Sequence, residues 1–212
     1  MKLYFSPGAC SLSPHIVLHE AGIAHEAIPA PTKTHRLPDG ADYYTVNPLG
    51  YVPLLELDDG ARLREAAVIV QYIADLAPAR NLIPANGTMA RYRVLEWLNF
   101  IATELHKGFS PLFNTSTPID VKNAAKLKLK SRFTWVDSQL EGRDFLGGEN
   151  FGVADAYLYV MTTWAQRMEL DLNGLARLQG FISRVAARPS VKAALAMEQK
   201  HQQQQAQQQQ QQ

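Results

Sequence analysis

The chain has 212 residues and a formal net charge of +1, because 21 lysines and arginines nearly balance 20 aspartates and glutamates. So small a charge argues against electrostatic binding to nucleic acid, and no apolar run is long enough to predict a membrane-spanning helix. The first residues lack the apolar core of a secretory signal, and the single cysteine can form no internal disulfide. A cytoplasmic protein that binds neither nucleic acid nor membrane is expected.

Residues 1–78 predict short strands and helices in alternation. An apolar strand at 3–5 leads into a helix that begins near Ser11 or Ser13 and ends at Gly22. Further strands are expected at 25–30 and 52–57, then a hairpin turn at 58–60 and an amphipathic helix at 65–77. The strand–helix–strand order implies a parallel pair and the hairpin adds antiparallel strands, so this half is a small mixed sheet with helices on its faces.

The rest of the chain predicts helices and no strand. Residues 79–87 are expected to form a linker, and residues 88–201 an all-helical domain. Its first helix, 88–113, is apolar nearly all round and should be buried; others are expected at 120–140, 153–168, 175–187 and 191–196. The segment 202–212 contains ten glutamines and one alanine, and predicts a disordered tail.

Cys10 lies between the end of a predicted strand and the start of a helix. Backbone N–H groups and the helix dipole favour an anion there, so they would stabilise a thiolate on Cys10 or on a bound ligand. A buried structural cysteine is the alternative. Ser11 could donate a hydrogen bond to the thiolate or cap the helix.

Two other patterns carry possible chemistry. Asn99 and His106 share one direction on the apolar helix 88–113, with Thr103 between them, which predicts either an internal hydrogen-bond network or a wet groove. His15 and His19 have metal-ligand spacing, but no third ligand is evident, so a solvated helix face and no metal are expected.

Five segments in order resemble a bacterial glutathione transferase of the cysteine-containing beta class: residues 7–13, 46–53, 65–66, 96–109 and 151–156. The similarity runs through residues 1–201. It implies a thioredoxin-like N-terminal domain at 1–78, an all-helical C-terminal domain at 88–201, a homodimer, and glutathione as cosubstrate. In the last segment Gly152 stands where the family usually has serine or threonine, and Asp155 is expected to cap the helix.

The resemblance also implies a site. Cys10, Ser11 and His106 become the catalytic candidates, and a cis Val52–Pro53 bond would let the Val52 backbone pair with a peptide-like ligand. The remaining candidate ligands of glutathione are Ala9, His35, Tyr51, Glu65, Ala66, Asn99, Thr103 and Lys107.

Two features of the implied site need comment: the residue at position 66 and the apolar wall. Many family members have serine where this chain has Ala66, so one hydroxyl contact to the γ-glutamyl group is missing. Phe109, Phe113 and Trp164 would form an apolar wall for the second substrate, with plain core packing as the alternative.

The predicted function is conjugation of the glutathione thiolate to small hydrophobic electrophiles. Two alternatives remain. One is a glutathione-dependent thiol–disulfide oxidoreductase acting through Cys10, which a single cysteine permits. The other is a non-catalytic carrier of apolar ligands.

Overall fold

The computed structural model describes the backbone of residues 1–210 and the side chains of residues 1–203. The chain divides into two compact units: residues 1–80 with the segment from Ala187 onward form unit 1, and residues 81–186 form unit 2. The C-terminal helix thus belongs to unit 1, whereas the sequence placed it in the helical domain. Among the described residues, no helix combines the length and apolar character needed to span a membrane.

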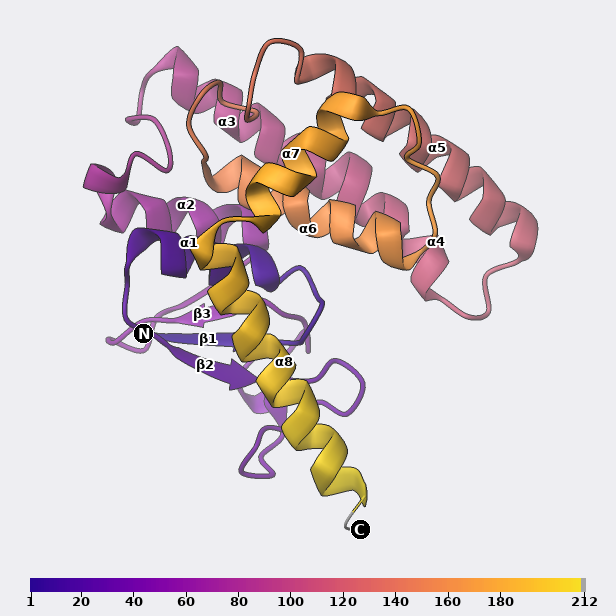
Figure 1. The fold of residues 1–212 in the computed structure, drawn as a ribbon. Coiled ribbons are helices and arrows are strands. Elements are labelled where there is room, and N and C mark those ends of the chain that lie inside the picture. Colours follow the sequence, from indigo (N-terminus) through magenta and orange to yellow (C-terminus); the bar gives the residue numbers. More distant parts are fainter. Residues whose placement is uncertain (211–212) are drawn as a thin grey trace. The chain divides into compact units, whose positions relative to one another are not determined.

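Unit 1 is built on a four-stranded mixed sheet (Figure 1). Its strands are β1 (Lys2–Phe5), β2 (Glu26–Pro29), β3 (Leu54–Glu56) and β4 (Arg62–Arg64), in the order β2-β1-β3-β4. β1 is parallel to β2 and antiparallel to β3, and β3 forms the predicted hairpin with β4. The predicted mixed sheet is confirmed.

The last three residues of β1 are buried on both faces of the sheet. Leu3 and Phe5 are fully buried, while Tyr4 packs in a cluster that includes Tyr43 and Leu54. Tyr43 belongs to the short 3₁₀ turn η1 (Tyr43–Thr45). Burial raises the pKa of this tyrosine to about 12, so its hydroxyl stays protonated and can donate.

Two helices follow strands of this sheet. Helix α1 (Leu12–Ala21) ends at Gly22, whose left-handed φ of 69° confirms the predicted C-cap. Helix α2 (Ala66–Leu76) leads into the 3₁₀ turn η2 (Pro78–Arg80). α1 packs against both α2 and α8 (Pro189–Gln210), which explains why eight of its ten residues are buried.

Helix α8 is longer than the sequence suggested. A short helix at 191–196 and a disordered tail at 202–212 were expected, but the helix continues to Gln210. Once nucleated on α1, a helix adds glutamine at little cost, because glutamine is a good helix former. Residues 211 and 212 lie outside the described residues.

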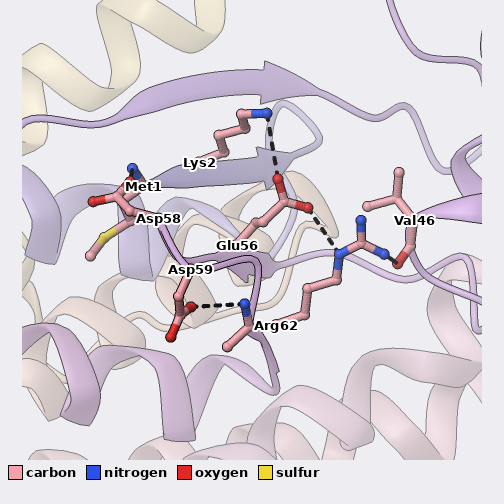
Figure 2. Close-up of polar contacts among 8 residues, drawn as sticks. Met1, Lys2, Val46, Glu56, Asp58, Asp59 and Arg62 are labelled. Carbon is pink, nitrogen blue, oxygen red and sulfur yellow. Dashed lines mark hydrogen bonds and ion pairs between the residues drawn. The ribbon is translucent and has the colours of Figure 1, made fainter.

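A polar network runs along the hairpin edge of the sheet (Figure 2). Glu56 on β3 accepts a hydrogen bond from Arg62 Nε at 2.9 Å and lies 3.4 Å from Lys2 Nζ. Arg62 also donates to the Val46 carbonyl at 2.8 Å. Asp59 closes the turn by accepting from the amide two residues later. The network therefore holds the loop before β3 against the hairpin.

Unit 2 takes its regular structure from helices: α3 (Met89–Phe100), the π-helix η3 (Ile101–His106), the 3₁₀ turn η4 (Lys107–Phe109), α4 (Ser110–Phe113), α5 (Ile119–Gln139), α6 (Val153–Arg167) and α7 (Ala176–Ala186). The predicted single helix at 88–113 is thus four consecutive helical segments. It is also less buried than predicted, because Arg91 and Leu98 are the buried residues of α3. Helix α6 is the core of the unit, with 12 of its 15 residues buried.

Asp155 anchors the start of α6. Its side chain is buried, with one oxygen accepting from the Gly152 amide and the other from the Leu146 amide, both at 2.8 Å. The predicted capping role of Asp155 is confirmed. Glycine suits position 152 because a Cβ there would lie 2.8 Å from the Leu82 carbonyl oxygen.

We expect Asp155→Ala to lower the free energy of unfolding by about 3 kcal/mol, because it leaves one buried and one partly buried amide without an acceptor. Urea denaturation followed by circular dichroism measures this change. Asp120→Ala is the matched control: Asp120 is exposed in the first turn of α5 and should contribute less than about 1 kcal/mol. Equal losses in the two variants would contradict the anchoring role.

Candidate functional site

The predicted site residues fall in both units. In unit 1, Cys10 stands in the loop between β1 and α1. Its side chain is buried, and its Sγ lies 3.3 Å from the Val52 carbonyl oxygen, to which the thiol donates. The structure therefore brings the predicted nucleophile to the predicted ligand-pairing residue. Ala9 lies beside them, packed on the cluster that contains Val52.

The Ser11 hydroxyl bonds within the loop that carries Cys10 and does not cap α1. It makes no capping contact with α1; instead it accepts from the Ser6 amide at 3.1 Å and donates to the Ser6 carbonyl at 3.2 Å. Because its one proton is used in this way, Ser11 shapes the loop that carries Cys10.

The bend before β3 contains the predicted cis Val52–Pro53 peptide bond. Asn47 holds this bend: it is buried, and its side-chain amide donates to the Tyr51 carbonyl at 2.7 Å. Its oxygen accepts from Arg64 Nε at 3.0 Å. Asn47 thus ties the bend to the end of β4. This role of Asn47 was not predicted, although a polar residue beside Pro48 in a turn was the available signal.

Glu65 is the next residue after β4 and starts α2 with a φ of 68°. Non-glycine residues seldom adopt this conformation, and such strain concentrates at functional sites. The Glu65 side chain is exposed and makes no capping contact, whereas Ala66 is buried at the first helical position. The start of α2 therefore offers backbone amides to an anion beside an exposed carboxylate.

His35 also lies near the bend. Its ring stacks on Tyr44 with centroids 4.5 Å apart, and a Cβ on Gly50 would lie 2.9 Å from the His35 ring. His35 thus approaches the residue before Tyr51, whose own side chain is 67% exposed. Together, the loop of Cys10, the bend at Val52, the start of α2 and His35 converge in one region of unit 1.

In unit 2, the predicted polar face of Asn99, Thr103 and His106 is divided. Asn99 and Thr103 are exposed, and the Thr103 hydroxyl bonds to the Asn99 carbonyl at 2.9 Å. Lys107 is exposed as well. His106 instead lies against α6, because the π-helical turn of η3 spaces residues more widely than the α-helix assumed.

The His106 ring is held within unit 2 by Tyr157 and Trp164. Its Nδ1 lies 2.6 Å from the Tyr157 hydroxyl, and its centroid is 4.9 Å from that of Trp164. Burial lowers the pKa of His106 to about 4, and the positive charge of Lys107 adds to this effect. His106 is therefore a neutral imidazole at neutral pH. Tyr157 was missed; the signal was a polar hydroxyl on an apolar helix.

The three predicted wall residues are in contact. The Trp164 centroid lies 4.8 Å from that of Phe113 and 5.6 Å from that of Phe109. Phe109 is fully buried and acts as core, whereas Phe113 is 41% exposed. The surface available to a ligand thus comes mainly from Phe113, supported by Trp164.

One expectation on α1 is wrong. His15 and His19 do not form a solvated helix face: His15 is fully buried and His19 partly buried. Periodicity could not show this, because it depends on the long helix α8 that packs on α1.

Two family descriptions match the chain: the glutathione S-transferase N-terminal domain over residues 8–76 and the C-terminal domain over residues 100–189. Glutathione S-transferase GstA of Escherichia coli O157:H7 is 43% identical over 198 residues, covering 93% of this chain and 98% of GstA. Glutathione S-transferase GST-4.5 of Xanthomonas campestris pv. campestris is 38% identical over 205 residues, with the same two coverages.

Solved structures agree. The ternary complex of BphK, a bacterial transferase of this kind, superposes with a TM-score of 0.91 at 48% identity and covers 93% of this chain and 99% of BphK. A sphingomonad glutathione S-transferase complexed with glutathione gives 0.90 at 44% identity, covering 93% and 98%. The bacterial beta-class enzyme of Sphingomonas chungbukensis gives 0.90 at 42% identity, with the same coverages. The predicted thioredoxin-like and all-helical fold is confirmed, and the chain belongs to the glutathione S-transferase family, with the bacterial beta class among its relatives.

Proposed function

We propose that this glutathione transferase conjugates the thiolate of glutathione to small hydrophobic electrophiles. One observation carries the proposal: in unit 1 the loop of Cys10, the cis Val52–Pro53 bend and the start of α2 converge. These three features offer a thiolate-stabilising helix end, an unusual backbone bend and an anion site, which match the three parts of a tripeptide thiol.

Each part of glutathione has a proposed partner in unit 1. The backbone of the cysteinyl residue pairs with Val52 as an added strand would. The γ-glutamyl carboxylate binds the amides at the start of α2, beginning at Ala66, while exposed Glu65 pairs with the α-amino group. The glycine carboxylate lies towards His35.

The sulfur lies at the N-terminus of α1, where the helix dipole favours a negative charge. The thiol gives its proton to solvent, and the thiolate sulfur then forms a bond to the electrophilic carbon while the leaving group departs with its bonding electrons. The rate increases because the two substrates are held close together and because the thiolate is stabilised.

The electrophile binds to unit 2. Phe113 and Trp164 give an apolar surface, and the neutral His106 beside them offers a hydrogen-bonding nitrogen without the cost of burying a charge. Asn99, Thr103 and Lys107 are exposed polar groups on the same stretch of chain, which suits them to contact polar parts of a ligand.

We propose a cytoplasmic homodimer. Large apolar side chains are exposed in each unit, including Tyr51 at 67% and Met89 at 70%, and contacts between copies would cover some of them. The cytoplasm suits a protein whose single cysteine must stay reduced.

A second function is favoured by the position of Cys10. Its Sγ lies at the carbonyl to which the cysteinyl part of glutathione would pair. A Cys10 thiolate would attack the glutathione sulfur of a mixed disulfide and release the other thiolate. A second glutathione thiolate would then attack the Cys10–glutathione disulfide, which forms oxidised glutathione and restores Cys10.

The proposed function is tested by the rate of glutathione conjugation to an aryl halide, in wild type and in Cys10→Ser. We expect a rate that saturates in glutathione and that Cys10→Ser reduces by less than about tenfold, because the helix end stabilises the thiolate of the ligand itself. The same variant should lose all disulfide reduction. Binding of glutathione without turnover would instead indicate a carrier, and reduction without conjugation would indicate an oxidoreductase.

We expect Ala66→Ser to lower the KM for glutathione about fivefold, because a hydroxyl at the start of α2 adds one hydrogen bond to the γ-glutamyl group, worth about 1 kcal/mol. Steady-state kinetics with glutathione varied gives this value. Ala67→Ser, one residue later on the helix, should change the KM by less than about twofold. Equal effects would show that Ala66 does not face the ligand.

The neutral state of His106 makes stability depend on pH. Its folded pKa of about 4 lies below the unfolded value of 6.5, so the stability it contributes is present above pH 6.5 and is lost as the pH falls through 4. Between pH 7 and pH 5, wild type should lose on the order of 2 kcal/mol more than His106→Asn. Denaturation curves at the two pH values measure the difference.

The same variant tests the part played by His106 in turnover. At pH 7, His106→Asn should lower kcat about tenfold, equivalent to about 1.4 kcal/mol. Tyr157→Phe, which removes the hydroxyl on His106 Nδ1 and keeps the ring, should have a smaller effect. An unchanged kcat in His106→Asn would leave this histidine a packing role.

A further inference from the structure

We propose that His15, His19 and His25 in unit 1 form a binding site for one divalent transition-metal ion of the zinc type. Each side chain offers one ring nitrogen, and these three atoms lie within 4.8 Å of one another. The proposal does not depend on glutathione binding, because none of the three residues belongs to the site described above.

The fold brings the third histidine to the first two. His15 and His19 are one turn apart on α1 and their rings stack with centroids 5.1 Å apart. Gly22 then reverses the chain, and His25 arrives just before β2 with its ring 5.4 Å from that of His15 and 5.2 Å from that of His19. Three imidazoles therefore meet at one turn.

The hydrogen bonds of His25 leave its second nitrogen available. Its Nδ1 donates to the Ile23 carbonyl at 2.9 Å, so Nε2 carries the lone pair. This Nε2 and the Nε2 of His19 are buried, and neither bonds to any residue that the structure describes. A backbone carbonyl on the far side of a ring is the usual support of a metal-bound histidine.

His15 has a corresponding support. Its side chain is fully buried, neither nitrogen has a hydrogen-bond partner among the described residues, and Nδ1 lies 3.6 Å from Glu198 Oε1. Glu198, on α8, is itself buried, and its other oxygen accepts from the Gly8 amide at 2.9 Å. A metal bound to His15 Nε2 would leave the ring proton on Nδ1, where it faces the Glu198 carboxylate. The His15 ring and Glu198 Oε1 would then each have a partner.

The chemistry of three imidazoles selects the ion. Imidazole nitrogen suits Zn²⁺, Cu²⁺ and Ni²⁺, whereas Mg²⁺ and Ca²⁺ prefer oxygen. Zn–N bonds of about 2.0–2.1 Å place tetrahedral ligand atoms about 3.4 Å apart, so the rings need to approach by roughly 1.4 Å at most.

Zn²⁺ titration of the full chain, produced without a histidine tag and stripped of metal, tests the site. We expect one Zn²⁺ per chain and a raised Tm, because only the folded chain assembles the three ligands. His19→Gln and His25→Gln should each weaken binding at least tenfold. His35→Gln and Cys10→Ser are the matched controls and should bind as wild type does.

Three results would overturn the proposal. They are no saturable Zn²⁺ binding by wild type, an affinity unchanged in both His19→Gln and His25→Gln, and a loss of binding in Cys10→Ser. Circular dichroism of each variant confirms that it is folded. Co²⁺ in place of Zn²⁺ supplies a second readout, since its visible spectrum reports nitrogen ligands and should change in the two cluster variants.

Discussion

The short connection from β1 into α1 is the constraint on which unit 1 depends. Ser11 bonds to both backbone groups of Ser6, so the loop that holds Cys10 is closed on itself. Because β1 and β3 are antiparallel, the end of β1 lies beside the start of β3, and Cys10 therefore meets Val52. Glu198 then fastens the same loop to α8 through the Gly8 amide.

Local chemistry made much of this predictable. The strands, the C-cap at Gly22 and the hairpin turn follow from short-range rules, and the cis bond at Val52–Pro53 followed from the family resemblance. The remainder depends on contacts between distant segments. The π turn of η3 leaves the apolar pattern unchanged, so helical spacing could not show that His106 lies against α6. His25 joins the other histidines through a turn, which helical spacing cannot show.

Desolvation acts on histidine in two places with different results. In unit 2 the neutral His106 has a hydrogen-bond partner in Tyr157. In unit 1 the nitrogens of His15 have no hydrogen-bond partner among the described residues, and two further rings face it. Removing histidine from water therefore leads to a hydrogen bond in unit 2, whereas in unit 1 it leaves ring nitrogens without a hydrogen-bond partner among the described residues.

The π turn also bears on how a helix can gain a residue in evolution. An i→i+5 turn is what an α-helix becomes when one residue is inserted and the flanking turns keep their register. A single-codon insertion between Ile101 and His106 in an ancestral α-helix would be taken up by this one turn, so the side chains of α3 and those after the turn would keep their directions. A helix can thus gain one residue in a single genetic event without repacking the segments on either side of it.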